Sequence, residues 1–340
     1  MPMSGPVRLG IIGAGGVVAG FHLPVLAALD GVRVDWIYDV DEARARELQK
    51  RFGIGAVPKT VADAGDVDAV LVATPVGSRV EILDVVAKRR WHAFCEKPFA
   101  ATPEDHERMI AALAGARRLA GVGLVRRFYT STKTARDLVR SEILGPVESV
   151  LAGEGLRARK FGRGEWYQSD ARATGGGVFA ETGTHLVDQV LTVVGAQRVE
   201  LRQCRQERVN GLEMETRLTG TLTLSSGSTV PLTMGVSRLN DVYNGIVVRC
   251  HTGEIRLALD PEAGVDLVDR SGHKIGTLPG APKPGIYAAI RAEWVDFLDT
   301  CARPDASMPD TGLATTRFVA QAYARATVTA RTTREQEVFQ

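Results

Sequence analysis

Short apolar runs alternate with helical patterns along the first third of this 340-residue chain. The pairs are Val7 to Ile12 before Gly20 to Leu29, Arg33 to Tyr38 before Asp41 to Phe52, and Ala69 to Ala73 before Arg79 to Arg90. A strand followed by a helix and another strand is the unit of a parallel sheet, and strands covered on both faces read as unbroken apolar runs. The pattern therefore predicts a doubly wound α/β domain.

The pattern changes after residue 124. We expect a helix over Thr132 to Glu142, and strands of alternating polarity over Thr219 to Leu224 and Gly245 to Cys250. Alternation is typical of an antiparallel sheet with one covered face. Residues 286–303 and 311–331 return to helical spacing. We therefore expect two domains, residues 1–123 and residues 124–340.

Charge and cysteine usage exclude several classes of protein. The 42 basic and 40 acidic residues give a net charge of +2, which does not favour a nucleic-acid partner. The four cysteines include no C-x-x-C pair, so we expect neither a metal site nor a disulfide framework. This cysteine usage indicates a protein of the reducing cytoplasm. We expect no signal peptide and no membrane span.

A glycine-rich turn follows the first apolar run. Gly13 and Gly15 stand before a helix, followed by Gly16 and Val17, and this arrangement lets backbone N–H groups approach a diphosphate. Asp39 ends the second apolar run, where its carboxylate can accept from ribose hydroxyls and repel a 2′-phosphate. The pattern predicts NAD as cofactor. The alternative is a pair of turn glycines and a surface aspartate.

A second motif, Glu96-Lys97-Pro98, ends another short apolar run. Proline restricts the residue before it to extended geometry, so the backbone directs Lys97. A lysine held in this way can reach a substrate oxygen or the nicotinamide ribose. Taken alone, the tripeptide is more often an exposed turn.

A polar stripe follows the glycine run at residues 175–177. Glu181, His185 and Asp188 are spaced by four and three residues, so a helix would place them on one face. A histidine suits proton transfer near neutral pH, which makes His185 the candidate acid/base. Asp188 is a second substrate contact or a structural partner. A solvated helix face and a satisfied buried histidine are the alternatives.

In this order, the motifs resemble those of the Gfo/Idh/MocA family of NAD(P)-dependent oxidoreductases over nearly the whole chain. They are the G-x-G turn, Asp39 before a helix, Thr74-Pro75, Glu96-Lys97-Pro98, Arg127-Phe128, Leu144-Gly145-Pro146-Val147, and the glycine run with its E-x-G-x-H-x-x-D sequence.

The resemblance implies an N-terminal Rossmann domain and a C-terminal α/β domain whose large, mainly antiparallel open sheet forms a homodimer or homotetramer. It also implies roles for single residues. Lys97 would be the active-site lysine and His185 the acid/base, with Glu181 where many members carry aspartate. Further contacts are implied to the cofactor by Thr74, Pro75 and Glu96, and to the substrate by Lys97, Arg127, Glu181, His185 and Asp188.

Two departures concern the cofactor site. Where the family often has T-P-N-x-x-H, this chain has Val76 in place of asparagine and Arg79 in place of histidine. Val76 cannot hydrogen-bond through its side chain, so we expect the cofactor to be held by the backbone or with the additional help of Arg79.

A basic and aromatic segment, residues 157–167, precedes the glycine run. Arg159 and Arg163 would bind a substrate phosphate, and Trp166 or Tyr167 would stack on a sugar or base. The alternative is a solvated loop. The segment predicts a phosphorylated substrate, foremost a nucleoside diphosphate sugar.

The expected function is hydride transfer between NAD(H) and a secondary alcohol or ketone of a sugar, sugar nucleotide or cyclitol. Family members also use NAD redox-neutrally for epimerisation or glycoside cleavage, or serve as sugar-sensing regulators without catalysis. Because Lys97 and His185 are both present, catalysis is favoured over sensing.

Overall fold

A computed structural model describes residues 6–155 and 176–331, which divide into two compact units. The first unit comprises residues up to Val125 together with Tyr287–Leu313, and the second comprises Arg126–Ile286 with the residues from Ala314 onward. The sequence pattern placed Tyr287–Leu313 in the second domain, whereas the structure groups this segment with the first unit.

The first unit is built on a five-stranded parallel sheet in the order β2-β1-β3-β4-β5. Its strands are β1 (Val7–Ile12), β2 (Val32–Tyr38), β3 (Ala69–Val72), β4 (His92–Cys95) and β5 (Ala120–Val122). Its helices are the π-helix η1 (Val18–His22), α1 (Leu23–Ala27), α2 (Glu42–Phe52), the 3-10 helix η2 (Val76–Ser78), α3 (Arg79–Lys88), α4 (Pro103–Gly115) and α8 (Gly285–Ala302). The doubly wound parallel fold is confirmed.

Local sequence signals explain where the helices of this unit begin. The Asp41 carboxylate accepts from the N–H of Ala43 at the start of α2, and Thr102 Oγ1 accepts from the N–H of Asp105 at the start of α4. Pro103, which follows the Thr102 cap, has no N–H to leave unsatisfied.

The returning segment Tyr287–Leu313 contributes to the core of the first unit. The Trp294 ring of α8 stacks on Phe94 of β4 with centroids 4.4 Å apart. Beyond α8, Thr311 Oγ1 lies 2.8 Å from Nε2 of the fully buried His106. The first unit is therefore assembled from two distant parts of the sequence.

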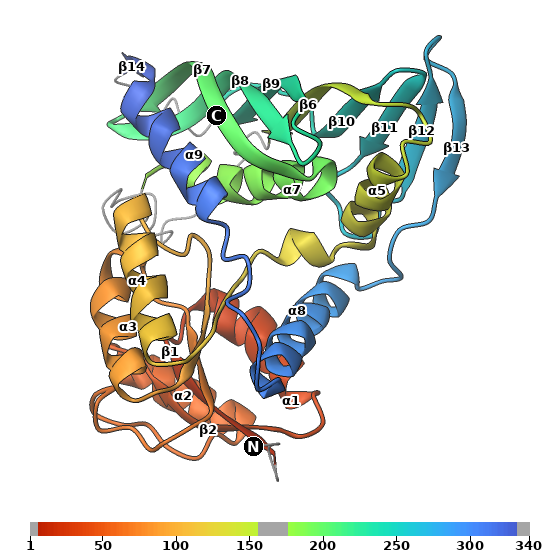
Figure 1. The fold of residues 1–340 in the computed structure, drawn as a ribbon. Helices are drawn as coiled ribbons and strands as arrows, with labels where there is room; N and C mark the ends of the chain where they lie inside the picture. Colours follow the sequence, from red (N-terminus) through yellow and green to blue (C-terminus); the bar gives the residue numbers. More distant parts are fainter. Residues whose placement is uncertain (1–5, 156–175, 332–340) are drawn as a thin grey trace. The chain divides into compact units, whose positions relative to one another are not determined.

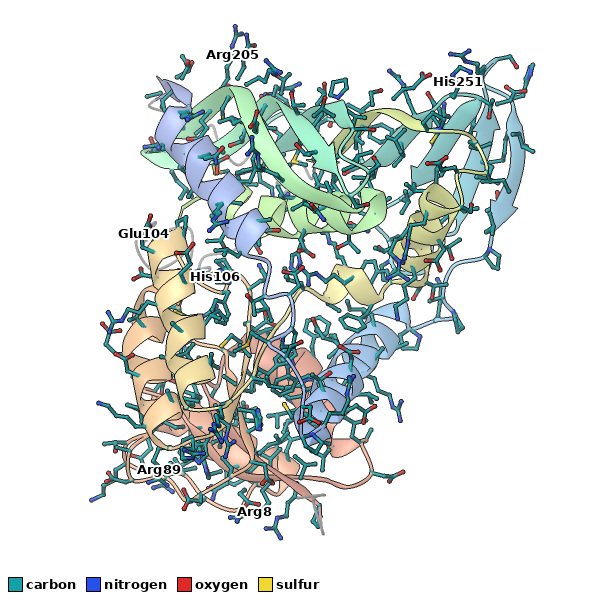
Figure 2. All side chains as sticks on the ribbon, viewed as in Figure 1. Arg8, Arg89, Glu104, His106, Arg205 and His251 are labelled. Atoms are coloured by element: carbon teal, nitrogen blue, oxygen red, sulfur yellow. The ribbon has the colours of Figure 1, made fainter. Side chains whose placement is uncertain are left out.

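Figure 2 labels His106 on α4. It also labels Arg8 and Arg205, whose exposed side chains project away from their strands.

The second unit contains a nine-stranded sheet in the order β13-β12-β11-β10-β6-β9-β8-β7-β14. Its strands are β6 (Val147–Gly155), β7 (Ala196–Val209), β8 (Leu212–Leu224), β9 (Thr229–Ser237), β10 (Gly245–Cys250), β11 (Gly253–Leu257), β12 (Val265–Asp269), β13 (Lys274–Leu278) and β14 (Thr327–Arg331). Only the pairs β6·β9 and β7·β14 are parallel. The mainly antiparallel sheet is confirmed.

Helices cover one face of this sheet (Figure 1). They are α5 (Thr130–Arg140), the π-helix η5 (Phe179–Gly183), α7 (Thr184–Val194) and α9 (Leu313–Arg325), and the 3-10 helix η3 (Val125–Phe128) precedes α5. The predicted helix over 311–331 is wrong at its end, because β-branched Thr327, Val328 and Thr329 pair with β7 as strand β14.

Candidate functional site

The glycines of the first turn have two different surroundings. Gly13 follows β1 with φ of +108°, and a Cβ there would lie 2.5 Å from the carbonyl oxygen of Ala73. Only glycine tolerates both conditions. A Cβ on Gly15 or Gly16 would meet no atom within 4 Å. Packing therefore requires glycine at Gly13, while Gly15 and Gly16 leave open space that fits a diphosphate at the start of the helix.

Asp39 is bonded to this turn. Its Oδ2 accepts from the N–H of Ala14 at 2.6 Å, and its Oδ1 accepts from the N–H of Asp41 at 2.8 Å. A carboxylate offers about four lone-pair positions. Those that remain on Asp39 can accept hydrogen bonds from ribose hydroxyls, so the residues present fit a dinucleotide.

Arg79 ties together the turns that follow β3 and β4. Its guanidinium is buried and donates to the carbonyl oxygens of Thr74, Glu96 and Pro98. Burial lowers the pKa of Arg79, although the charge of Glu96 acts in the opposite direction. The sequence predicted a contact between this side chain and the cofactor. In the structure, the side chain is hydrogen-bonded to the protein's own backbone. Arg79 positions the Thr74-Pro75 turn.

Thr74 offers a different kind of contact from Arg79. Its Oγ1 is buried and has no hydrogen-bond partner among the described residues. A buried hydroxyl without a partner is costly. A bound cofactor would satisfy this hydroxyl, which supports Thr74 rather than Arg79 as the polar contact of the turn.

Glu96 is held by a chain of hydrogen bonds that the sequence did not reveal. The Trp294 indole N–H can only donate, so the His22 Nδ1 atom, 2.9 Å away, must accept. The proton of this neutral ring is then on Nε2, which donates to Glu96 Oε1 at 2.8 Å. Glu96 Oε2 accepts from the N–H of Lys97 at 3.0 Å. The backbone of Lys97 is thereby fixed through Glu96 and His22.

The charge state of Glu96 follows from its surroundings. Burial acts to raise its pKa, but the hydrogen bond from His22 and the positive charges of Lys97 and Arg79 outweigh it, and the pKa is lowered. Glu96 is therefore ionised at neutral pH. The Lys97 side chain is half-buried, and its peptide bond to Pro98 is cis.

In the second unit, the glycine run packs against the protein itself. Tyr323 Oη of α9 accepts from the N–H groups of Gly177 and Ala180 and donates to Glu213 Oε2. A Cβ on Gly176 would lie 2.6 Å from Tyr323, and one on Gly177 would lie 2.1 Å from the Glu213 carbonyl oxygen. These two glycines allow close packing of the chain before η5.

Two of the three residues in the predicted stripe are partly accessible. Glu181 lies on η5 with 43% of its side chain exposed, and its Oε2 accepts from Thr182 Oγ1 and lies 3.9 Å from Arg238 Nη2. His185 lies in the first turn of α7 and is half-buried. The stripe therefore starts on a π-helix and continues on an α-helix.

Asp188 is buried one turn further along α7. Both of its carboxylate oxygens accept from Arg127, at 2.6 and 2.8 Å, and Thr315 Oγ1 adds a longer bond. Such a bidentate pair is specific in geometry. The contacts favour the structural role for Asp188, with Arg127 as its ion-pair partner.

The predicted site residues fall in three groups. Lys97 and the cofactor residues belong to the first unit, and Glu181, His185, Asp188 and Arg127 belong to the second. Arg159, Arg163, Trp166 and Tyr167 lie outside the described residues. All four cysteines are free thiols.

Residues 6–155 and 176–331 hold no cluster of three or more His, Cys, Asp or Glu that could bind a metal ion. They include no helix that is long and apolar enough to cross a membrane.

Two family models match the chain. Residues 7–124 match the NAD-binding Rossmann fold of the GFO/IDH/MocA oxidoreductase family, and residues 132–256 match the C-terminal domain of the same family.

Related sequences align with part of the chain. The rhizopine catabolism protein MocA of Rhizobium meliloti is 30% identical over 57% of this chain and 59% of its own length. Myo-inositol 2-dehydrogenase of Thermotoga maritima is 31% identical over 41% and 42%, respectively. A dTDP-3,4-didehydro-2,6-dideoxy-α-D-glucose 3-reductase of Streptomyces antibioticus is 30% identical over 56% and 57%. The chain therefore spans less than two thirds of the length of these relatives.

Solved structures share the fold over nearly the whole chain. A 3-ketoreductase from Actinomadura kijaniata, in complex with NADP and TDP-benzene, superposes with a TM-score of 0.78 at 21% identity, covering 96% of this chain and 99% of that one. An oxidoreductase from Agrobacterium radiobacter, in complex with NAD⁺, L-tartaric acid and magnesium, gives 0.76 at 22% identity, covering 94% and 96%. At these identities the similarity establishes a common fold.

Proposed function

Because the chain belongs to the GFO/IDH/MocA family of oxidoreductases, we propose that it transfers hydride between NAD(H) and a secondary alcohol or ketone of a sugar, sugar nucleotide or cyclitol. The observation that carries the proposal is the bond from the Ala14 N–H to Asp39, beside the open space over Gly15 and Gly16. This arrangement supplies donors for a diphosphate and acceptors for a ribose in one place.

The cofactor we propose is NAD rather than NADP. The Asp39 carboxylate would accept from the ribose hydroxyls and repel a 2′-phosphate. Gly13, Gly15, Gly16 and Val17 would approach the diphosphate. Thr74, Pro75 and Glu96 would complete the site, with Arg79 shaping its turn.

The bound nicotinamide would supply or accept the hydride, and residues of this chain would handle the proton. His185 would take the proton from the substrate hydroxyl during oxidation and return it during reduction. Lys97 would donate a hydrogen bond to the same oxygen and stabilise its developing negative charge. Glu181 would contact the substrate or orient His185.

From the sequence, we propose that the segment before the glycine run, residues 157–167, recognises the substrate. Arg159 and Arg163 would bind a substrate phosphate, and Trp166 or Tyr167 would stack on a ring. Replacing both arginines with glutamine should raise KM for a nucleoside diphosphate sugar and leave NAD affinity unchanged. A substrate without phosphate, turned over equally well by the double variant, would leave these arginines without this role.

The direct test of the function is NADH formation with a panel of cyclitols, sugars and nucleoside diphosphate sugars. Net formation with one class of substrate supports a dehydrogenase. Conversion of a substrate without net NADH would instead establish redox-neutral chemistry. NAD binding without conversion of any substrate in the panel would favour the sensing alternative.

The acid/base role has a matched control. His185→Ala should lower kcat roughly 10²–10⁴-fold, as expected for loss of a positioned general base. The control is His273→Ala, because the His273 side chain is 84% exposed on a surface turn. Near-native kcat in His185→Ala would assign the proton transfer to another group.

We also propose that the chain forms a homodimer or homotetramer through the second unit. The helices cover the sheet face that carries Leu218 and Met234, while the opposite face exposes the cross-strand pair Thr219 and Thr233. Replacing both threonines with arginine should produce monomers in analytical ultracentrifugation. An unchanged assembly would place the interface elsewhere.

A further inference from the structure

A cavity lies in the first unit, at the sheet edge opposite the glycine turn. It has a volume of about 680 Å³. Asp68 precedes β3, His92 begins β4 and Leu119 precedes β5, so the cavity faces the amino ends of three parallel strands. Dinucleotides bind at the carboxyl ends of such strands. This cavity is therefore distinct from the proposed cofactor site.

The lining is strongly basic. Four arginines contribute to it, and the one acidic residue is Asp68, whose Oδ2 accepts from the N–H of Arg8. The arginines are Arg90, Arg117, Arg118 and Arg303. None of these four guanidinium groups forms an ion pair within the part of the chain that the structure describes. Asp68 attracts Arg118 without forming an ion pair, and the rest of this positive charge is left for solvent or for a ligand to neutralise.

Two of these arginines occupy positions where glycine is the easiest residue. Arg90 follows α3 and Arg117 follows α4, with φ of +58° and +56°. Each ends its helix with the same paired bonds, from Arg90 N to Ala87 O and Trp91 N to Val86 O in α3, and correspondingly in α4. At the ends of α2 and α7 the left-handed residue is glycine, Gly53 and Gly195. A left-handed arginine costs free energy relative to glycine, which suggests that these side chains have a function.

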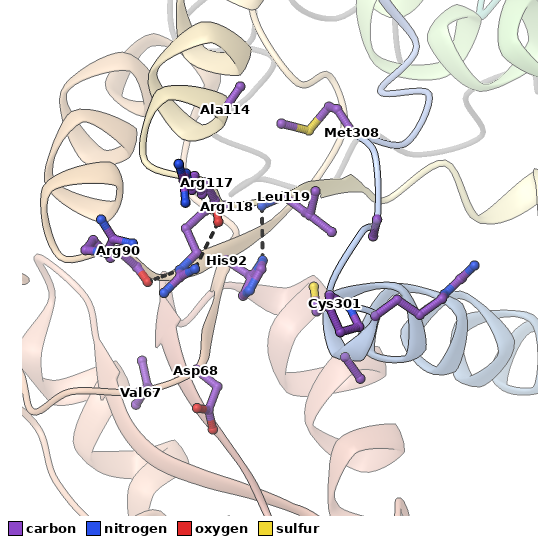
Figure 3. Close-up of a pocket in the computed structure, with 14 residues that line it drawn as sticks. Val67, Asp68, Arg90, His92, Ala114, Arg117, Arg118, Leu119, Cys301 and Met308 are labelled. Carbon is purple, nitrogen blue, oxygen red and sulfur yellow. Dashed lines mark hydrogen bonds between the residues drawn. The ribbon is translucent and has the colours of Figure 1, made fainter. Parts of the chain in front are cut away.

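The neighbouring groups leave the cavity lined mainly by hydrogen-bond donors. Arg118 donates to the carbonyl oxygens of Arg90 and Arg117, which fixes the two left-handed turns beside one another (Figure 3). His92 Nδ1 accepts from the N–H of Leu119 at 3.0 Å, so its proton is on Nε2. Burial and the charge of Arg118 lower the pKa of His92 to about 4, and the neutral ring therefore persists at pH 7.

We propose that this cavity binds a phosphate monoester. The three terminal oxygens of a phosphoryl group can accept from several guanidinium groups at once, which a planar carboxylate does less well. Leu119, Pro304 and Met308 add apolar lining for the organic part of the ligand. The volume lies within the usual range of small-molecule sites, roughly 300–1,000 Å³.

Phenyl phosphate is a suitable probe, because it carries both chemical features and is unlike a sugar. Calorimetry at constant ionic strength should show that it binds, that inorganic phosphate binds more weakly, and that phenol does not bind. Replacing Arg90 and Arg117 with glycine should weaken binding of phenyl phosphate at least about tenfold. The melting temperature should be unchanged or higher, because glycine relieves both left-handed positions.

The matched control removes two other arginines of the same unit. Arg44 and Arg108 have side chains 63% and 58% exposed, in surface ion pairs. The variant R44Q/R108Q should bind phenyl phosphate as the wild type does. Equal affinity in R90G/R117G and wild type, or no binding by the wild type at millimolar phenyl phosphate, would overturn the proposal.

The alkylation rate of Cys301 provides a second measurement of ligand binding, which needs no arginine variant. Cys301 lines the cavity and is partly exposed, whereas the other three cysteines are buried. Phenyl phosphate should slow the alkylation of Cys301 by a neutral maleimide, followed by mass spectrometry, at least about threefold when the site is largely occupied. An unchanged rate at saturating phenyl phosphate would place the bound ligand outside this cavity and contradict the assignment.

Discussion

The carboxyl edge and the amino edge of the five-stranded sheet present different chemical groups. At the carboxyl edge, glycines open the backbone, and Asp39 and Glu96 are bonded to neighbouring N–H groups. At the amino edge, Arg90 and Arg117 stand where glycine would be easier, and their charges have no acidic partner in the described chain. The first edge offers backbone donors and the second offers side-chain cations. The same short strands would thus support the two proposed anion sites, which differ in chemistry.

The largest expected difference between the edges is in catalysis. Lys97→Ala should lower kcat roughly 10²–10⁴-fold, because Lys97 is proposed to stabilise the developing charge on the substrate oxygen. Lys88, exposed in the last turn of α3 at the other edge, is the matched control. Steady-state kinetics of Lys97→Ala and Lys88→Ala make the comparison. A similar loss in both would remove the catalytic distinction.

Two glycines of one turn should respond differently to the same change. Gly13→Ala should lower the free energy of unfolding by roughly 2–4 kcal/mol, because its Cβ would meet the Ala73 carbonyl at a positive φ. Gly15→Ala should keep its stability and lose NAD affinity, since its Cβ would project into open space. Urea unfolding and calorimetry separate the two effects. Full NAD affinity in Gly15→Ala would move the diphosphate away from this turn.

We expect the choice of cofactor to depend on the Asp39 carboxylate. Asp39→Ser should weaken NAD binding roughly 10–100-fold, because acceptors for the ribose hydroxyls are lost, and should reduce the preference over NADP. Calorimetry with both dinucleotides measures the change. Equal affinity of the wild type for NAD and NADP would contradict the role of Asp39.

The smallest expected effect is a difference between the two edges in how the free energy of unfolding depends on pH. With its pKa lowered to about 4, His92 stays neutral in the fold while the unfolded ring is protonated below 6.5. The fold is therefore stabilised above pH 6.5, and this contribution is lost as the pH falls towards 4. His92→Asn should remove a pH dependence of roughly 1–2 kcal/mol, given its partial exposure.

Glu96, at the carboxyl edge, has a lowered pKa, so its contribution is lost only below its ordinary value of 4.5. Urea unfolding at pH 7, 5 and 3.5, in buffers without phosphate, resolves the two windows. Loss of the pH 5 effect in Glu96→Gln rather than in His92→Asn would reverse the assignment.

Local patterns predicted what depends on local contacts. The first four strands of the parallel sheet follow from apolar runs, and the turn at Gly13 and the position of Asp39 follow from spacing. The bond from Trp294 to His22 could not be predicted, because 272 residues separate its ends and no spacing rule relates them. Tyr323 was missed for the same reason, since its hydroxyl bonds the glycine run from another helix.

Arg79 shows a different limit of sequence reasoning. Its position after Thr74-Pro75 suggested a cofactor contact, yet its guanidinium is bonded to backbone carbonyls. Sequence indicates which residue can donate, whereas packing decides where the donors point. Glycines pose the same problem, because Gly15 leaves open space while Gly177 lies against Glu213.

The return of residues 287–313 to the first unit has a consequence for synthesis on the ribosome. Phe94 and Gly121 emerge early, but Trp294 and Phe297, which pack against them, follow about 170 to 200 residues later. The nascent Rossmann sheet therefore exposes an apolar face throughout translation of the second unit. We expect a chaperone or a transient self-contact to shield this face, and a chain truncated before residue 287 to aggregate rather than fold.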